Sequence, residues 1–327
     1  MIKAEQDVLF SLSDVKKYYP IKGGLFKRTV GHIKAVDGIT LDIYNGETLG
    51  VVGESGCGKS TFGRTILGLE ELTEGSLMFE DTALEKLSSR ALMPFKKKMQ
   101  MVFQDPYASL NPKQRIGKAI EEPMVIHTNL SKKERFKAVI NLLQEVGLRP
   151  GHYWNFPHEF SGGQRQRIGI ARALAIKPSF IVCDEPVSAL DVSIQAQVIK
   201  LLKDLQVSHQ LTYLFVSHDL GVVRHICDRV LVMYLGQAVE LTTAEALYKN
   251  PLHPYTEALL SAIPRPIVNR DKVRMKLEGD IPSAAEPPSG CAFHTRCPIA
   301  TAKCKQERPI WREAREGHLI ACHERGK

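Results

Sequence analysis

The stretch GVVGESGCGKST (50–61) constrains the fold of this 327-residue chain more than any other. Gly53, Gly58, Lys59 and Ser60 match the spacing G-x-x-x-x-G-K-[ST] of a phosphate-binding loop, the P-loop. An apolar run precedes the match and a helical pattern follows it, so a chance glycine-rich turn is the weaker interpretation. The loop is predicted to hold phosphate through nine residues: Gly53, Glu54, Ser55, Gly56, Cys57, Gly58, Lys59, Ser60 and Thr61.

Short apolar runs alternate with amphipathic segments up to about residue 240, which predicts an α/β fold with a mostly parallel sheet. The expected strands are residues 48–53, 99–103, 180–184, 212–218 and 229–235. Residues 131–147 predict a helix, with a capping box at Ser131 and Glu134, an apolar face that includes Phe136, and Gly147 at the end.

Polar side chains follow two of these predicted strands. Asp184 and Glu185 come at the end of 180–184, where Asp184 is placed to hold Mg²⁺ with the Ser60 hydroxyl. Glu185 is placed to take a proton from an attacking water. His218 ends another strand and is either a structural residue or one that reaches the γ-phosphate.

A second anion-binding helix end is predicted at Ser161, Gly162 and Gly163, although an ordinary glycine-rich cap is an alternative. The net charge of +8 would suit nucleic acid, anionic lipid or polyphosphate, but scattered basic residues favour an ordinary solvated surface. We expect no signal peptide, since the N-terminus has no apolar core, and no apolar run is long enough to span a bilayer.

Taken together, the P-loop, SGGQ, DEP, SALD and SHD motifs resemble the nucleotide-binding subunits of ABC transporters. The resemblance implies that Gln104 senses Mg²⁺ and the membrane partner, and that Tyr19 stacks on adenine, with Tyr18 a close competitor. It also implies contacts to ATP on an opposite subunit, made by Ser161, Gly163, Gln164 and Asp191. Phe160 replaces the commoner leucine before SGGQ.

QDPYASLNPKQRI and NPLHPYTEALLSAIP narrow the resemblance to the F-type ATPase of bacterial dipeptide and oligopeptide importers. This implies ATP hydrolysis that drives peptide import, a second ATPase subunit as heterodimer partner, two transmembrane permease subunits and an extracytoplasmic peptide-binding protein. The chain would lie peripherally on the cytoplasmic face of the inner membrane, docked through residues 105–123, without binding nucleic acid. A nickel or other small-solute importer is the alternative; ABC proteins of DNA repair or translation, and a degenerate non-hydrolysing partner, fit the sequence less well.

The expected domains are an ABC nucleotide-binding domain at 1–240, with a helical subdomain at about 105–165, and a small cysteine-rich C-terminal extension at 241–327. In the extension Cys291, Cys297, Cys304 and Cys322 are separated by five, six and seventeen residues. Unrelated thiols, structural Zn²⁺ with help from His294 and His323, and an iron–sulfur cluster are the three interpretations. The uneven spacing favours a cluster, and the importer resemblance implies a [4Fe–4S] cluster with a structural role.

Overall fold

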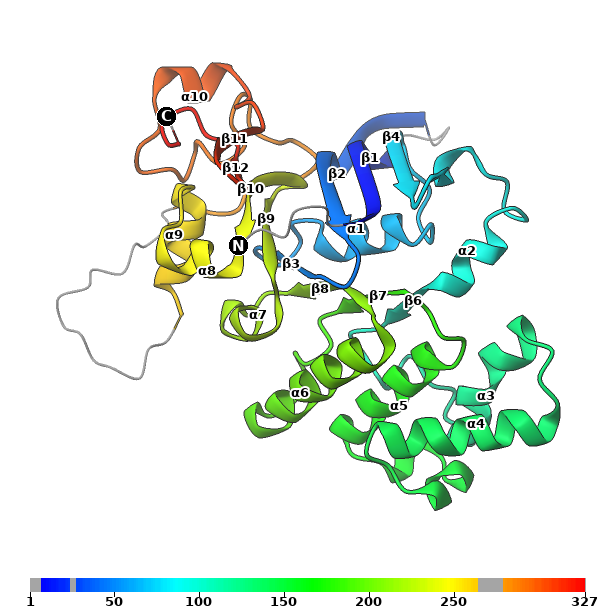
Figure 1. Cartoon of the computed structure of the whole chain (residues 1–327). Coiled ribbons are helices and arrows are strands. Elements are labelled where there is room, and N and C mark those ends of the chain that lie inside the picture. The colour runs from blue at the N-terminus through cyan, green and yellow to red at the C-terminus, as the bar shows by residue number, and fades with distance from the viewer. Residues whose placement is uncertain (1–6, 24–27, 264–278, 327) are drawn as a thin grey trace. The chain divides into compact units, whose positions relative to one another are not determined.

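The computed structural model describes residues 7–23, 28–263 and 279–326. The chain forms two compact units. The first unit comprises Met1–Lys86 and Ser217–Lys327, and the second comprises Leu87–Val216. Figure 1 labels most of the helices and strands of both units.

An antiparallel sheet forms the N-terminal part of the first unit. Its strands, in sheet order, are β2 (Arg28–Tyr44), β1 (Val8–Gly23), β4 (Glu74–Phe79) and β5 (Thr82–Ala83), followed by the 3-10 turn η1 (Leu84–Lys86). β1 and β2 pair along their whole length, from Val8 opposite Tyr44 to Gly23 opposite Arg28. Phe10 and Phe79 are fully buried between neighbouring strands, with ring centroids 4.7 Å apart.

The rest of the first unit is built on β3 (Thr48–Val52), which pairs in parallel with β9 (Arg229–Tyr234). The antiparallel strands β10 (Gln237–Thr243), β12 (His318–Ile320) and β11 (Arg312–Arg315) continue this sheet. Its helices are α1 (Lys59–Ile66), α7 (Leu220–Ile226), α8 (Ala244–Lys249), α9 (Pro254–Ser261) and α10 (Ala302–Gln306). The C-terminal strand β12 is therefore joined, through β10 and β9, to β3, the strand that directly precedes the P-loop (Figure 1).

The second unit carries three parallel strands, β6 (Met99–Val102), β7 (Phe180–Asp184) and β8 (Thr212–Ser217). Every residue of β7 and β8 is buried, which explains their continuous apolar sequences. The helices are α2 (Met93–Lys98), α3 (Ile116–His127), α4 (Lys132–Glu145), α5 (Gly162–Leu174) and α6 (Val192–His209), with 3-10 turns η2 (Pro150–Trp154) and η3 (Pro157–Glu159). Helix α3 packs on α4 and on α5 (Figure 1).

All five strands expected from the sequence are confirmed, to within one residue at their ends. The predicted helix at 131–147 is confirmed as α4, with the capping box between Ser131 and Glu134 and a left-handed Gly147 just beyond its end. Phe136 departs from the expected buried face: it is 39% exposed, and its ring lies against Tyr153 instead. Among the described residues no helix is long and apolar enough to cross a membrane.

Candidate functional site

The P-loop joins β3 to α1 in the first unit, and its end glycines cannot be replaced without a clash. A Cβ on Gly53 would lie 2.2 Å from the Met233 carbonyl oxygen, and one on Gly58 would lie 1.9 Å from the Ala35 carbonyl oxygen. Gly58 also has a φ of 102°, in the left-handed region. It is the N-cap of α1, and no side chain of the described residues caps this helix end. The positive end of α1 is therefore directed at the loop, as an anion-binding site requires.

Lys59 points back into the same loop. Its ammonium donates to the carbonyl oxygens of Gly53 and Glu54, both at 2.9 Å, and lies 3.9 Å from the Cys57 sulfur. The residue is only 5% exposed. The loop thus encloses a positive charge where the sequence predicts bound phosphate.

Glu54 is bound by two residues of the C-terminal region that the sequence did not single out. Its backbone N–H donates to the Tyr255 hydroxyl at 2.9 Å, and its carboxylate accepts two hydrogen bonds from Arg296 at 2.7 and 3.0 Å. Contacts across such sequence separations leave no local signal. Tyr255 lies in the stretch NPLHPYTEALLSAIP and Arg296 directly precedes Cys297, but neither position reveals a contact with the P-loop.

The two candidate adenine-stacking tyrosines, neighbours on β1, have different partners. The Tyr18 hydroxyl donates to the Asp37 carboxylate. The Tyr19 hydroxyl interacts with Thr61, a P-loop residue, and with Glu70; burial raises the pKa of Tyr19. Tyr19 therefore lies beside the P-loop helix.

Gln104, Asp184 and Glu185 lie together in the second unit. Asp184 ends β7 and is 1% exposed. The Gln104 amide donates to the Glu185 carboxylate at 2.9 Å, so the structure brings these two predicted residues together. Glu185 has a φ of 45°, a left-handed conformation that is rare for a residue with a side chain.

The SGGQ segment begins α5 with a complete capping box. The Ser161 hydroxyl accepts from the Gln164 N–H, and the Gln164 side chain accepts from the Ser161 N–H at 3.0 Å. Gly163 is buried against α6, where a Cβ would meet Ile194 at 2.5 Å. Ser161 and Asp191, the N-cap residue of α6, are exposed, and Asp191 does not use its side chain to cap the helix. His218 follows β8 in the first unit and is exposed.

The four cysteines of the C-terminal region gather in one place. The Cys291 N–H donates to the Cys304 carbonyl at 2.8 Å. Burial, together with a smaller contribution from the other three thiols, raises the pKa of Cys291 to about 11. The predicted auxiliary ligands are engaged with the backbone, since ring nitrogens of His294 and His323 bond the carbonyls of Cys291 and Glu307. A set of thiols is a suitable donor set for zinc or an iron–sulfur cluster. Among the described residues, however, no group of three histidine, cysteine or acidic side chains is arranged to hold a metal ion.

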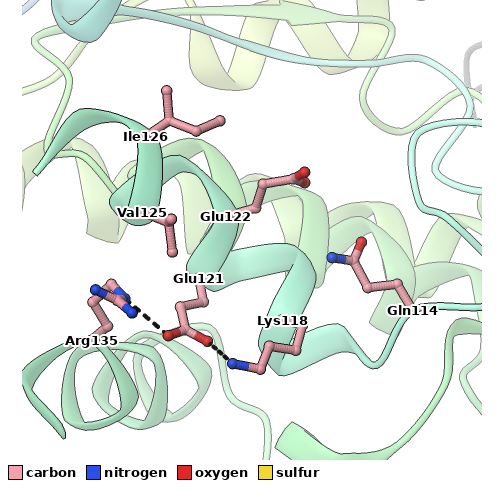
Figure 2. A pocket seen from close by; sticks show the side chains of 7 residues that line it. All are labelled: Gln114, Lys118, Glu121, Glu122, Val125, Ile126 and Arg135. Atoms are coloured by element: carbon pink, nitrogen blue, oxygen red, sulfur yellow. Dashed lines mark hydrogen bonds and ion pairs between the residues drawn. The ribbon is translucent and has the colours of Figure 1, made fainter. Parts of the chain in front are cut away.

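A hollow of about 330 Å³ lies on the second unit between α3 and α4, within and beside the predicted membrane-partner region. Figure 2 shows the Glu121 carboxylate between Lys118 and Arg135, which donate to it at 2.5 and 2.9 Å. Burial alone would raise the pKa of Glu121, but these two cations lower it below its ordinary value. Val125 and Ile126, farther along α3, are 55% and 64% exposed.

Comparison with known proteins assigns the class. Residues 36–188 match the family model described as ABC transporter, and residues 239–304 match the one described as oligopeptide/dipeptide transporter, C-terminal region. The dimeric post-hydrolysis structure of the ATP-binding cassette MJ0796, bound to ADP and Pi, is 30% identical with a TM-score of 0.64, covering 72% of this chain and 98% of that one. The chain belongs to the ABC transporter family and is an ABC-type ATPase with a P-loop NTPase fold.

Three curated relatives match nearly the whole chain. The oligopeptide transport ATP-binding protein AppF of Bacillus subtilis is 55% identical over 99% of both chains. The dipeptide transport ATP-binding protein DppF of Haemophilus influenzae is 51% identical over 97% of both. The oligopeptide transport ATP-binding protein OppF of Salmonella typhimurium is 52% identical over 97% of this chain and 96% of its own length.

Proposed function

We propose that this chain hydrolyses ATP to drive import of dipeptides and oligopeptides through a membrane transporter. The observation that carries the proposal is the match of residues 239–304 to the C-terminal region of oligopeptide/dipeptide transporters. Relatives named for peptide transport at about half identity support it. The same match favours peptides over the nickel alternative.

The proposed partners are a second ATPase subunit, two permease subunits and an extracytoplasmic peptide-binding protein. The chain would work at the cytoplasmic face of the membrane. We propose that the hollow at Glu121 and the exposed Val125 and Ile126 meet a permease subunit, since exposed apolar residues beside a buried charged group suit a protein partner.

Each site residue has a proposed chemical role. Lys59 and the P-loop N–H groups other than that of Glu54, which is bonded to Tyr255, would bind the ATP phosphates, and Tyr19 would stack on adenine. Ser60, Asp184 and Gln104 would hold Mg²⁺, which supplies charge neutralisation to the transferring phosphoryl group. Glu185 would accept the proton of the attacking water, with its carboxylate oriented by Gln104, and His218 would reach the γ-phosphate.

The start of α5, where Ser161 is exposed, suits contact with a second ATPase chain. Ser161, Gly163 and Gln164 would bring the positive end of α5 to ATP held by that chain, and Asp191 would lie at the same interface. The capping box supports this role because it fixes the first turn of α5 before any nucleotide arrives.

We also propose two domains, with the boundary near residue 240 and a cysteine-rich extension at 241–327 that holds a [4Fe–4S] cluster, with Zn²⁺ as the alternative. The gathering of Cys291, Cys297, Cys304 and Cys322 supports this. Metal binding would add folding free energy to a region with few apolar residues. Protein purified without oxygen should absorb broadly near 400 nm and contain about four irons per chain. A colourless preparation with one zinc would reject the cluster, and one with neither metal would reject the site.

The peptide-import proposal is tested in vesicles that contain the whole complex. Labelled peptide should accumulate only with ATP and the binding protein present, and ATP hydrolysis should rise with peptide. Nickel uptake without peptide uptake would support the alternative, and ATP hydrolysis that no solute stimulates would contradict both.

A further inference from the structure

Glu54, in the middle of the P-loop, has two of its groups held by the C-terminal region. Its N–H is bonded to Tyr255 of α9 and its carboxylate to Arg296, which precedes Cys297. Its carbonyl accepts from Lys59 at 2.9 Å. Two side chains that lie 201 and 242 residues away in sequence therefore hold this residue of the phosphate-binding loop in place.

These contacts are largely shielded from solvent. The Arg296 side chain is 7% exposed and that of Glu54 is 23% exposed. Tyr255 is fully buried and packs on Tyr234 and Phe293, with ring centroids 4.8 and 5.3 Å away. A bidentate guanidinium–carboxylate pair in such surroundings is directional and poorly screened by salt.

The pair also neutralises a negative charge within the loop. A carboxylate in a loop that binds a polyanion would repel it, and the repulsion is strongest where water is scarce. Arg296 neutralises this carboxylate through two charge-assisted hydrogen bonds. The Tyr255 hydroxyl fixes the Glu54 N–H toward α9, so this N–H is not among those directed at phosphate.

We propose that Arg296 and Tyr255 are positioning residues of the ATP site: through Glu54 they hold the P-loop in its phosphate-binding conformation and neutralise its one acidic side chain. ATP affinity of this chain then depends on a correctly folded C-terminal region. The proposal rests on the proposed ATP-binding role of the P-loop.

A charge-removal cycle on the purified full-length chain tests it, with ATP affinity measured by equilibrium titration and folding by thermal melting without nucleotide. Arg296→Gln leaves Glu54 as an uncompensated negative charge and should weaken ATP binding by about tenfold. Glu54→Gln loses the bidentate contact but leaves no uncompensated negative charge, so it should weaken ATP binding by no more than about threefold. The double variant should recover to within about threefold, because the repulsive charge is gone.

Arg325→Gln is the matched control, since Arg325 is a C-terminal arginine that pairs with Glu257 of α9 at 3.7 Å. It should leave ATP affinity unchanged. Unchanged affinity in Arg296→Gln, or a loss that persists in the double variant, overturns the proposal. A loss that persists would mean that Arg296 acts through stability or touches ATP itself.

If Arg296→Gln does not fold, Arg296→Lys carries the same test, because lysine keeps the charge but cannot make the bidentate contact. It should lose about threefold in affinity, and adding Glu54→Gln should cause no further loss, because both changes remove the same contact; losses that add together overturn the inference. Failure of the unaltered chain to bind ATP would instead contradict the proposed function.

Discussion

At the scale of single residues, the backbone of Glu185 distinguishes it from the other acidic residues near the proposed site. Glu185 has a positive φ that no helix end explains. Gln210, by contrast, also has a positive φ, but it ends α6, where a left-handed residue is common. Glu185 directly follows β7 and ends no helix. Such a conformation costs of the order of 1 kcal/mol and persists only where surrounding contacts enforce it. Here its N–H donates to the Val216 carbonyl at 3.0 Å and its side chain accepts from Gln104, so the carboxylate is held in one place.

Glu185→Gln should therefore keep ATP binding and lose hydrolysis by at least ~100-fold, because the amide preserves size and polarity but cannot accept the proton of water. Phosphate release by the assembled complex measures hydrolysis, and nucleotide titration measures binding. Glu80→Gln is the control, since Glu80 is exposed and shares the positive φ. Near-normal turnover in Glu185→Gln would reject Glu185 as the base.

At the scale of elements, the sequence predicted the buried parallel strands but not the antiparallel ribbon of β1 and β2. The parallel strands are continuous apolar runs, which is a strong signal. β1 has no such pattern, because its pairing with β2 shifts register several times, including between Leu12 and Val15 around the left-handed Asp14. Each shift interrupts the alternation of buried and exposed side chains that reveals a strand.

Helix α9 begins with a cap that should respond to pH. His253 is the N-cap, and its Nδ1 accepts from the Tyr255 N–H at 3.1 Å. Burial lowers the pKa of His253 from 6.5 to about 4, even though the nearby Glu240 carboxylate opposes the shift. Between these values the unfolded chain binds the proton and the folded chain does not, so folding stability falls as pH drops from about 6.5 toward 4. The fall should reach about 2–3 kcal/mol by pH 4.5.

The substitution His253→Asn keeps a side-chain acceptor at the cap but removes the titrating group, so the variant should be less stable at pH 7.5 yet lose little more at pH 4.5. Urea unfolding at both pH values makes the comparison, with the exposed His225→Asn as control. Burial raises the pKa of Glu240, but hydrogen bonds from His318, Thr256 and the backbone outweigh it, so the pKa lies below its ordinary value of 4.5. Protonation of Glu240 therefore lowers folding stability mainly below pH 4.5, outside the pH range compared here. An unchanged pH dependence in His253→Asn would contradict the assignment.

At the scale of the whole molecule, most of the candidate site was predictable because its motifs are local. The P-loop, Asp184, Glu185 and the capping box at Ser161 each occupy a few consecutive residues, and each local geometry matches its motif. The tie between Glu54 and Arg296 spans 242 residues, and no sequence pattern links a P-loop glutamate to a distant arginine. Only folding of the C-terminal region into the same unit as the P-loop brings them together.

The start of α5 is exposed on the second unit. Ser161 is turned to solvent with its cap already satisfied within its own helix, as suits a surface that completes an ATP site on another chain. The isolated chain should therefore be a poor ATPase, and phosphate release should rise steeply as the second ATPase subunit or the whole complex is added. Gly163→Val, which would force a Cβ into Ile194, should remove the part of that rise that comes from ATP held by the second subunit, while leaving ATP binding by this chain intact. Full activity of the isolated chain at high dilution would show that it hydrolyses ATP without a partner.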